Sequence, residues 1–136
     1  MEDNLISVFV GTAFGMAGYW VTTFWMRPIL RYRELRSKVL YELIFFAQVI
    51  NADDLNERMR TLYEDRVESN RRSSAALTGC VLELPYWYQA WLRMRGCNPE
   101  VAAENLIGLS NTTDYDKADK RIQRIKIALG IKTTVI

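Results

Sequence analysis

The sequence contains no histidine, and it has only two cysteines and three prolines in 136 residues. Without histidine, serine–histidine–aspartate triads are excluded, and most zinc and general-base sites are disfavoured. Cys80 and Cys97 lack C-x-x-C spacing, so we interpret them as small hydrophobic side chains in a reducing compartment. No glycine-rich, phosphate-binding loop is present either. We therefore expect a protein that is not an enzyme, with no catalytic residue, no metal and no cofactor.

Carboxylate pairs are the remaining candidates for acid–base chemistry. Glu64 and Glu68 are interleaved with arginines, which is typical of a solvated helix face. Asp114 and Asp116 precede a predicted helix, so helix capping accounts for them. An enzyme acting on a membrane substrate is therefore the least favoured hypothesis for this sequence.

Charge is absent from residues 5–26, LISVFVGTAFGMAGYWVTTFWM. At about 1.5 Å per residue, a helix of this length spans roughly 33 Å, and the hydrocarbon core of a bilayer is about 30 Å thick. We predict that residues 1–28 form a transmembrane span. The alternative is a cleaved signal peptide, but the acidic end MEDN argues against it, because the n-region of a signal peptide is basic.

Positive charge is concentrated directly after the uncharged segment. Against the single carboxylate of Glu34 stand Arg27, Arg31, Arg33, Arg36 and Lys38. Because cytoplasmic loops carry the excess of lysine and arginine, we predict that the N-terminus faces outward and that residues 29–136 are cytoplasmic, at a bacterial inner membrane. Trp20, Phe24 and Trp25 are then expected at the inner leaflet as interfacial anchors.

The residues beyond the span have the periodicity of helices. Residues 29–50 are predicted to form an amphipathic helix, with Pro28 as a kink or a new helix start. Its apolar face comprises Leu35, Val39, Leu43, Phe46 and Ile50. A second helix is predicted to start near Asn51, with Asp53 and Asp54 in its first turn, and to stop before Pro85. Its first half, ERMRTLYEDRVESNRR, is interpreted as a solvated surface with internal ion pairs.

Three shorter helices are predicted to follow. The first begins after Pro85 and ends at Gly96, and the start of the second is marked by Asn98 and Pro99. The third, at about 115–129, ends at Gly130. Its apolar stripe comprises Ala118, Ile122, Ile125 and Leu129. The predicted fold class is all-α, with one N-terminal transmembrane helix followed by a cytoplasmic bundle of about five helices.

Small residues recur along one face of the predicted span. They stand at steps of three and four residues, which is the spacing of one helix face: Ser7, Gly11, Gly15, Gly18 and Thr22. Membrane helices associate where small residues let their backbones approach closely, so this face predicts self-association into a homo-oligomer. The alternative is that glycine is simply common in membrane helices.

An aromatic cluster and two basic clusters are the other candidate sites. Trp87 and Trp91 lie one turn apart, and we interpret them as core residues. The alternatives are a contact with the membrane surface, or a platform on which a nucleotide or nucleic-acid base stacks. The candidate residues for contact with the membrane surface or a ligand are Arg27, Arg31, Arg33, Trp87, Trp91, Lys120, Arg121 and Arg124. The net charge of only +2 makes nucleic acid or a nucleotide a weakly supported partner.

The layout and the phrase ENLIGLSN at 104–111 resemble uncharacterised bacterial inner-membrane proteins with one N-terminal span and a small cytoplasmic helical domain. Some proteins of that build are membrane effectors of antiphage systems, which assemble in the bilayer and compromise it. The resemblance covers the architecture and implies no particular functional residue.

Two functional hypotheses follow, with membrane lipid as a partner in both. The first is a self-associating membrane protein whose helical domain controls or drives assembly, acting as an antiphage effector. The second is a membrane-tethered adaptor that recruits a cytoplasmic protein or binds an anionic nucleotide.

Overall fold

The computed structural model describes residues 1–49 and 56–132, and every regular element in these ranges is a helix. The predicted all-α class is confirmed. In chain order the elements are α1 (Glu2–Val21), η1 (Thr22–Met26), α2 (Arg27–Phe45), α3 (Glu57–Glu83), α4 (Tyr86–Met94), α5 (Pro99–Ser110) and α6 (Tyr115–Ala128).

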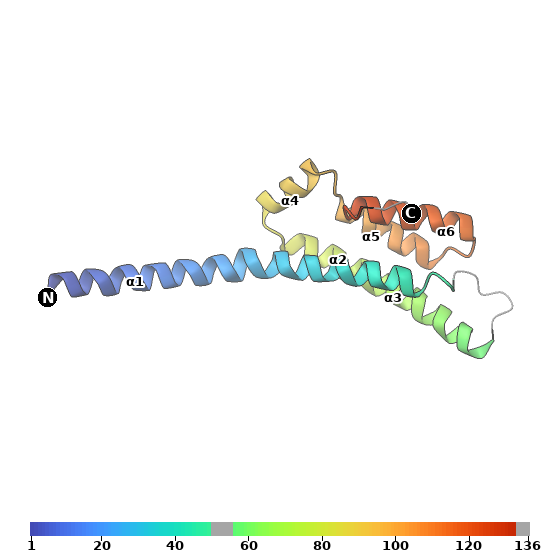
Figure 1. Ribbon diagram of the computed structural model, residues 1–136, viewed down its shortest axis with the longest axis horizontal. Helices are drawn as coiled ribbons and strands as arrows, with labels where there is room; N and C mark the ends of the chain where they lie inside the picture. Colours follow the sequence, from blue (N-terminus) through green and yellow to red (C-terminus); the bar gives the residue numbers. More distant parts are fainter. Residues whose placement is uncertain (50–55, 133–136) are drawn as a thin grey trace.

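The first three elements form one unbroken helix, Glu2–Phe45, of 44 residues (Figure 1). Its N-terminal half, α1, projects away from the rest of the protein and has no buried residue. Its most apolar window has a mean hydropathy of 1.5. In the described parts of the chain it is the helix long and apolar enough to cross a membrane. The predicted boundary at residue 28 falls inside this helix.

Pro28 neither kinks the long helix sharply nor starts a separate one. It follows the π-helical turn η1, in which the backbone N–H of Arg27 donates to the carbonyl of Thr22. Proline has no N–H to donate, and its ring clashes with the carbonyl one turn earlier in the helix. A widened helical turn moves such carbonyls away from the ring and lets them bond elsewhere. The helix therefore continues through the proline into α2.

The end of α2 differs from the prediction. It was predicted at residue 50, but the helix ends at Phe45, and the chain turns through hydrogen bonds from Ala47 N to Ile44 O and from Val49 N to Phe46 O. Val49 is then fully buried beyond the helix end. Residue Ile50 and the predicted helix start at Asn51, Asp53 and Asp54 lie outside the described residues.

Helix α3 begins at Glu57, and Asn56 caps it by accepting a hydrogen bond from Met59 N at 2.9 Å. It packs against α2 on one side and α5 on the other, and α6 packs on α5. The α3–α5 contact is close because small side chains meet there: Ser74 Oγ donates to the carbonyl of Ala103 at 2.7 Å. In Figure 1 α3 runs alongside α2, while α5 and α6 lie above both.

The predicted ends of the shorter helices are confirmed. Pro85 precedes α4, and Asn98 caps α5 with Pro99 in its first turn. Asp114 caps α6 by accepting from Asp116 N at 3.0 Å, as its proposed capping role required. Gly96 and Gly130 follow α4 and α6 with φ of 75° and 67°, in the left-handed region that favours glycine after a helix.

The core lies where α2, α3, α5 and α6 meet. The predicted stripes supply much of it, since Val39, Leu43, Ala118, Ile125 and Leu129 are all buried. Tyr32 is also buried, at 2% exposed, although the predicted face of α2 did not include it.

The arginine-rich start of α3 is only partly solvated, which corrects the sequence interpretation. Arg66 is 2% exposed, and its guanidinium donates to the carbonyls of Leu109 at 3.1 Å and Thr112 at 3.2 Å. It also lies over the Tyr63 ring, 5.1 Å from the centroid. Burial lowers the pKa of Arg66. A cation at the C-terminal end of α5 interacts favourably with the negative end of the helix dipole, and here it adds a second donor to Leu109 O, which also accepts from Thr112 N.

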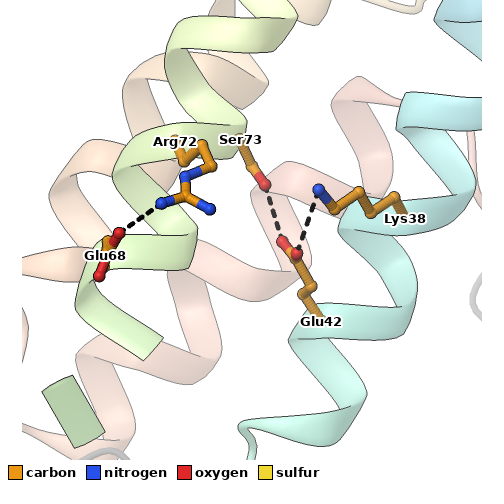
Figure 2. A network of polar contacts seen from close by, with 5 residues as sticks. All are labelled: Lys38, Glu42, Glu68, Arg72 and Ser73. Atoms are coloured by element: carbon orange, nitrogen blue, oxygen red, sulfur yellow. Dashed lines mark hydrogen bonds and ion pairs between the residues drawn. The ribbon is translucent and has the colours of Figure 1, made fainter. Parts of the chain in front are cut away.

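Figure 2 shows a polar contact between α2 and α3, together with an ion pair within each helix. Ser73 Oγ donates to Glu42 Oε2 at 2.7 Å, and Lys38 Nζ lies 3.8 Å from Glu42 Oε1. Arg72 pairs with Glu68 on the outer surface of α3, as the solvated interpretation of Glu68 predicted. Glu42 therefore links two helices, whereas the Glu68–Arg72 pair stays within one.

We expect Arg66→Met to lower the free energy of unfolding by about 2–4 kcal/mol, because it leaves two carbonyls at the end of α5 without their charged donor. Arg66→Lys should also destabilise, since an ammonium lacks the planar fork that reaches both carbonyls. The measurement is urea unfolding of the full chain in mild detergent. Arg72→Met is the matched control on the same helix, with an expected change within about 0.5 kcal/mol. Equal midpoints for the two methionine variants would contradict the role of Arg66.

Candidate membrane and ligand sites

The small-residue face of α1 is open along its whole length. A Cβ atom added at Gly11, Gly15 or Gly18 would meet no atom within 4 Å apart from its own stretch of helix backbone. Beside Gly15, the missing side chain leaves an apolar groove bordered by Met16 and Trp20. Another helix backbone can therefore approach this face without displacing any described side chain.

The hydroxyl groups on this face are bonded within the helix. Ser7 Oγ donates to the carbonyl of Asp3 at 2.9 Å, and Thr22 Oγ1 donates to the carbonyl of Gly18 at 2.8 Å. Back-bonding of this kind lets serine and threonine lie in apolar surroundings, where an unbonded hydroxyl is costly. The small face therefore presents no unbonded hydroxyl group from Ser7 or Thr22, and it is suited to contact with lipid or with another helix.

The π turn changes the direction of this face relative to the core. In an uninterrupted α-helix, the small face would continue from Thr22 through Trp25, Ile29 and Tyr32, which contact α4 and the core. The extra residue of a π turn rotates the following helix by about 100°. The small face and the buried face of α2 consequently point in different directions. The glycines themselves are uncovered because α1 extends beyond the bundle (Figure 1).

Helix α4 lies beside the junction of α1 and α2 (Figure 1). The rings of Trp25 and Trp87 meet edge to face, with centroids 5.9 Å apart. Since Trp25 is at the end of the uncharged segment, this contact holds α4 at that level. Tyr86 and Met94 are exposed by 90% and 86%, so α4 presents large apolar and aromatic side chains outward.

The two tryptophans of α4 are not core residues, contrary to the sequence interpretation. Trp87 and Trp91 are 52% and 42% exposed. Tyr88 and Leu92, one turn apart on the neighbouring face, contact the core instead. A short helix at the edge of the bundle buries only one narrow face, and the tryptophans flank it.

The predicted basic residues lie in several places rather than one. Arg31 pairs with Glu83 at 3.1 Å and so joins α2 to the end of α3. The guanidinium of Arg121 lies directly over Gly108, where the absence of a side chain lets α6 approach α5. Arg27, Lys120 and Arg124 are exposed.

Among the predicted contact residues, Arg27 and Arg31 line one pocket together with Glu34 and Glu83, whereas Arg33 and Trp91 line another. This second pocket lies between α2, α4 and the turn after α6, and residues outside the predicted contact set also line it: Tyr32, Arg36, Tyr88, Arg95 and Lys132. The sequence shows these residues as separate aromatic and basic clusters, and their spacing does not reveal that the clusters meet in one pocket. Burial raises the pKa values of Tyr32 and Tyr88, so both phenols remain protonated donors at neutral pH.

Cys80 and Cys97 are both free thiols, and Cys80 is buried as expected, with burial raising its pKa. Cys97 is half-buried beside Gly130. Among residues 1–49 and 56–132, no group of three or more cysteine or acidic side chains is arranged to hold a metal ion. The chain matches no family model, no curated protein and no solved structure.

We expect α4 to lie at the membrane surface when the apolar half of the long helix spans a bilayer. In a variant that keeps Trp87 as its sole tryptophan, with Trp25→Phe to retain an aromatic ring against it, lipids carrying a quencher close to the headgroup should quench its fluorescence. The control keeps a single tryptophan introduced as Tyr115→Trp, at the exposed start of α6, and should be unaffected. Equal quenching of the two variants would contradict this placement.

Proposed function

We propose that this chain is a single-span bacterial inner-membrane protein that self-associates through the small face of α1, while its cytoplasmic helical domain controls assembly. One observation carries the proposal: the small face of α1 is open, and the hydroxyl groups of Ser7 and Thr22 on this face are hydrogen-bonded within the helix. In lipid, close packing of small residues is the interaction that brings such helices together.

The charge distribution supports the orientation in this proposal. Arg27 and Arg33 are exposed directly after the apolar segment, and the acidic residues Glu2 and Asp3 lie at its other end. An excess of arginine next to a span favours the cytoplasmic side. The helical domain then lies beneath the inner leaflet, with the exposed side chains of α4 at its surface.

The biological role proposed for the assembly is that of an antiphage effector that compromises the membrane. Its support is the resemblance of the layout and of ENLIGLSN at 104–111 to proteins of that build. In the span, the hydroxyl groups of Ser7, Thr12 and Thr22 each donate to a carbonyl of the same helix. Any conducting path would consequently be enclosed by several copies rather than by one helix.

A tethered adaptor is the second candidate, favoured by an exposed aromatic patch at the far end of α2. Tyr41 and Phe45 stack with their ring centroids 6.0 Å apart, and both are exposed, together with Ile44. Exposed apolar patches of this kind mark contacts between proteins. In this case the span serves only as an anchor.

Replacing Gly11 and Gly15 together by isoleucine should convert an oligomer into a monomer, because two branched side chains hold the facing backbones apart. The measurement is the mass of the full chain in mild detergent. The matched control, Ala13→Ile with Ala17→Ile, adds similar bulk on another face and should keep the oligomer. An unchanged mass for the glycine variant would contradict self-association through this face. Biological activity that is retained after exchange of the whole span would favour the adaptor.

The orientation has its own test in intact cells. We expect Asp3→Cys to react with a membrane-impermeant maleimide added outside, whereas the natural chain, with Cys80 and Cys97 inside, should not react until the cells are permeabilised. Labelling of the natural chain in intact cells, with no gain from Asp3→Cys, would reverse the proposed orientation.

A further inference from the structure

The pocket between α2, α4 and the turn after α6 has a volume of about 620 Å³. This is within the range of small-molecule sites, roughly 300–1,000 Å³. One wall is aromatic, with Tyr88 and Trp91 5.3 Å apart between ring centroids, and Tyr32 meets Tyr88 edge to face. The pocket is therefore large enough for a ligand and has flat apolar surface as well as polar groups.

Positive charge converges on the pocket without an opposing carboxylate. Its lining includes Arg33, Arg36, Arg95 and Lys132, and no aspartate or glutamate. The ion pairs found among the described residues involve none of these four side chains. Like charges brought together repel one another, so an anion in the pocket would relieve this repulsion.

Two buried polar atoms of the lining residues lack a partner within the described chain. The hydroxyl of Tyr32 and Nε of Arg36 are both buried without a hydrogen bond. Elsewhere on the same guanidinium, Arg36 Nη2 donates to the carbonyl of Gly130 at 3.1 Å, which holds the side chain against the pocket wall. A buried donor without an acceptor is costly, so these atoms indicate that an acceptor belongs here.

We propose that this pocket binds a phosphate-bearing ligand, whose oxygens accept hydrogen bonds from Arg36, Arg95 and the hydroxyl of Tyr32. Guanidinium groups match phosphate oxygens in pairs, and a protonated phenol donates a further hydrogen bond. Arg33 and Lys132 add charge at the rim. The site is separate from the small face of α1, so it stands whether or not the spans associate.

Two sources of phosphate fit this chemistry, a soluble nucleotide and a phospholipid headgroup. At about 1.5 Å per residue, Arg33 and Arg36 lie roughly 10 and 15 Å along the helix beyond Met26. The headgroup layer is only about 5–7 Å thick on each side of the hydrocarbon core. This depth favours the soluble source, with the aromatic wall beside a nucleotide base.

The test uses the full chain in nanodiscs of phosphatidylcholine, with ATP and inorganic pyrophosphate as calorimetric probes. Arg95→Gln and Tyr32→Phe should each weaken probe binding about tenfold, the loss expected for one hydrogen bond to a charged group. Arg93→Gln is the matched control: it is exposed on the same helix and outside the pocket lining, and should change affinity less than about twofold. The oligomeric mass should be the same for all three variants.

The remaining outcomes separate the two sources or overturn the proposal. The phosphate comes from lipid if neither probe binds but phosphatidylglycerol in the nanodisc protects Arg95 from a guanidine-modifying reagent. This protection should occur in the natural chain and be lost in Tyr32→Phe. If Arg93→Gln and Arg95→Gln weaken binding equally, the probe senses only general positive charge and the pocket assignment is wrong. It is also wrong if neither probe binds and the lipid gives no protection.

Discussion

The arrangement of this protein depends on one unbroken helix, Glu2–Phe45, whose two halves lie in different surroundings. The N-terminal half contacts no core, while the C-terminal half buries Tyr32, Val39 and Leu43. A rigid helix transmits position along its length, so the level of the apolar half determines the level of everything packed on α2. The π turn at Thr22–Met26 preserves this continuity past Pro28 and also rotates one half relative to the other.

The rest of the bundle is held by close contacts of small side chains and by a few buried polar groups. Ser74 lets α3 approach α5, and Gly108 lets α6 approach α5 beneath Arg121. Arg66 then bonds the carbonyls at the end of α5, far from its own position in the sequence. These contacts bring the turn after α6 back to α2, where Arg36 bonds Gly130.

The contact between the turn after α6 and α2 brings charged residues together. Arginines of α2 and α4 and a lysine after α6 come to one pocket, beside aromatic rings that the edge of the bundle does not bury completely. The proposed membrane association and the proposed phosphate site therefore use different halves of the same long helix. The first depends on the absence of side chains, and the second on the convergence of charged ones.

Local chemistry in the sequence determined the apolar segment, the small face, and most helix ends. Asn98, Asp114, Gly96 and Gly130 act through neighbouring backbone groups, so their effects are visible without knowledge of the fold. Only the tertiary structure decided which polar residues are buried and which aromatic residues are exposed. Arg66 has the same local pattern as its solvated neighbours, and its partners Leu109 and Thr112 are distant in sequence. Likewise, Trp87 and Tyr88 are neighbours in sequence and differ only in which side of α4 meets the core. Burial and convergence depend on how helices pack, because contacts between distant segments leave no periodic signal in either segment alone.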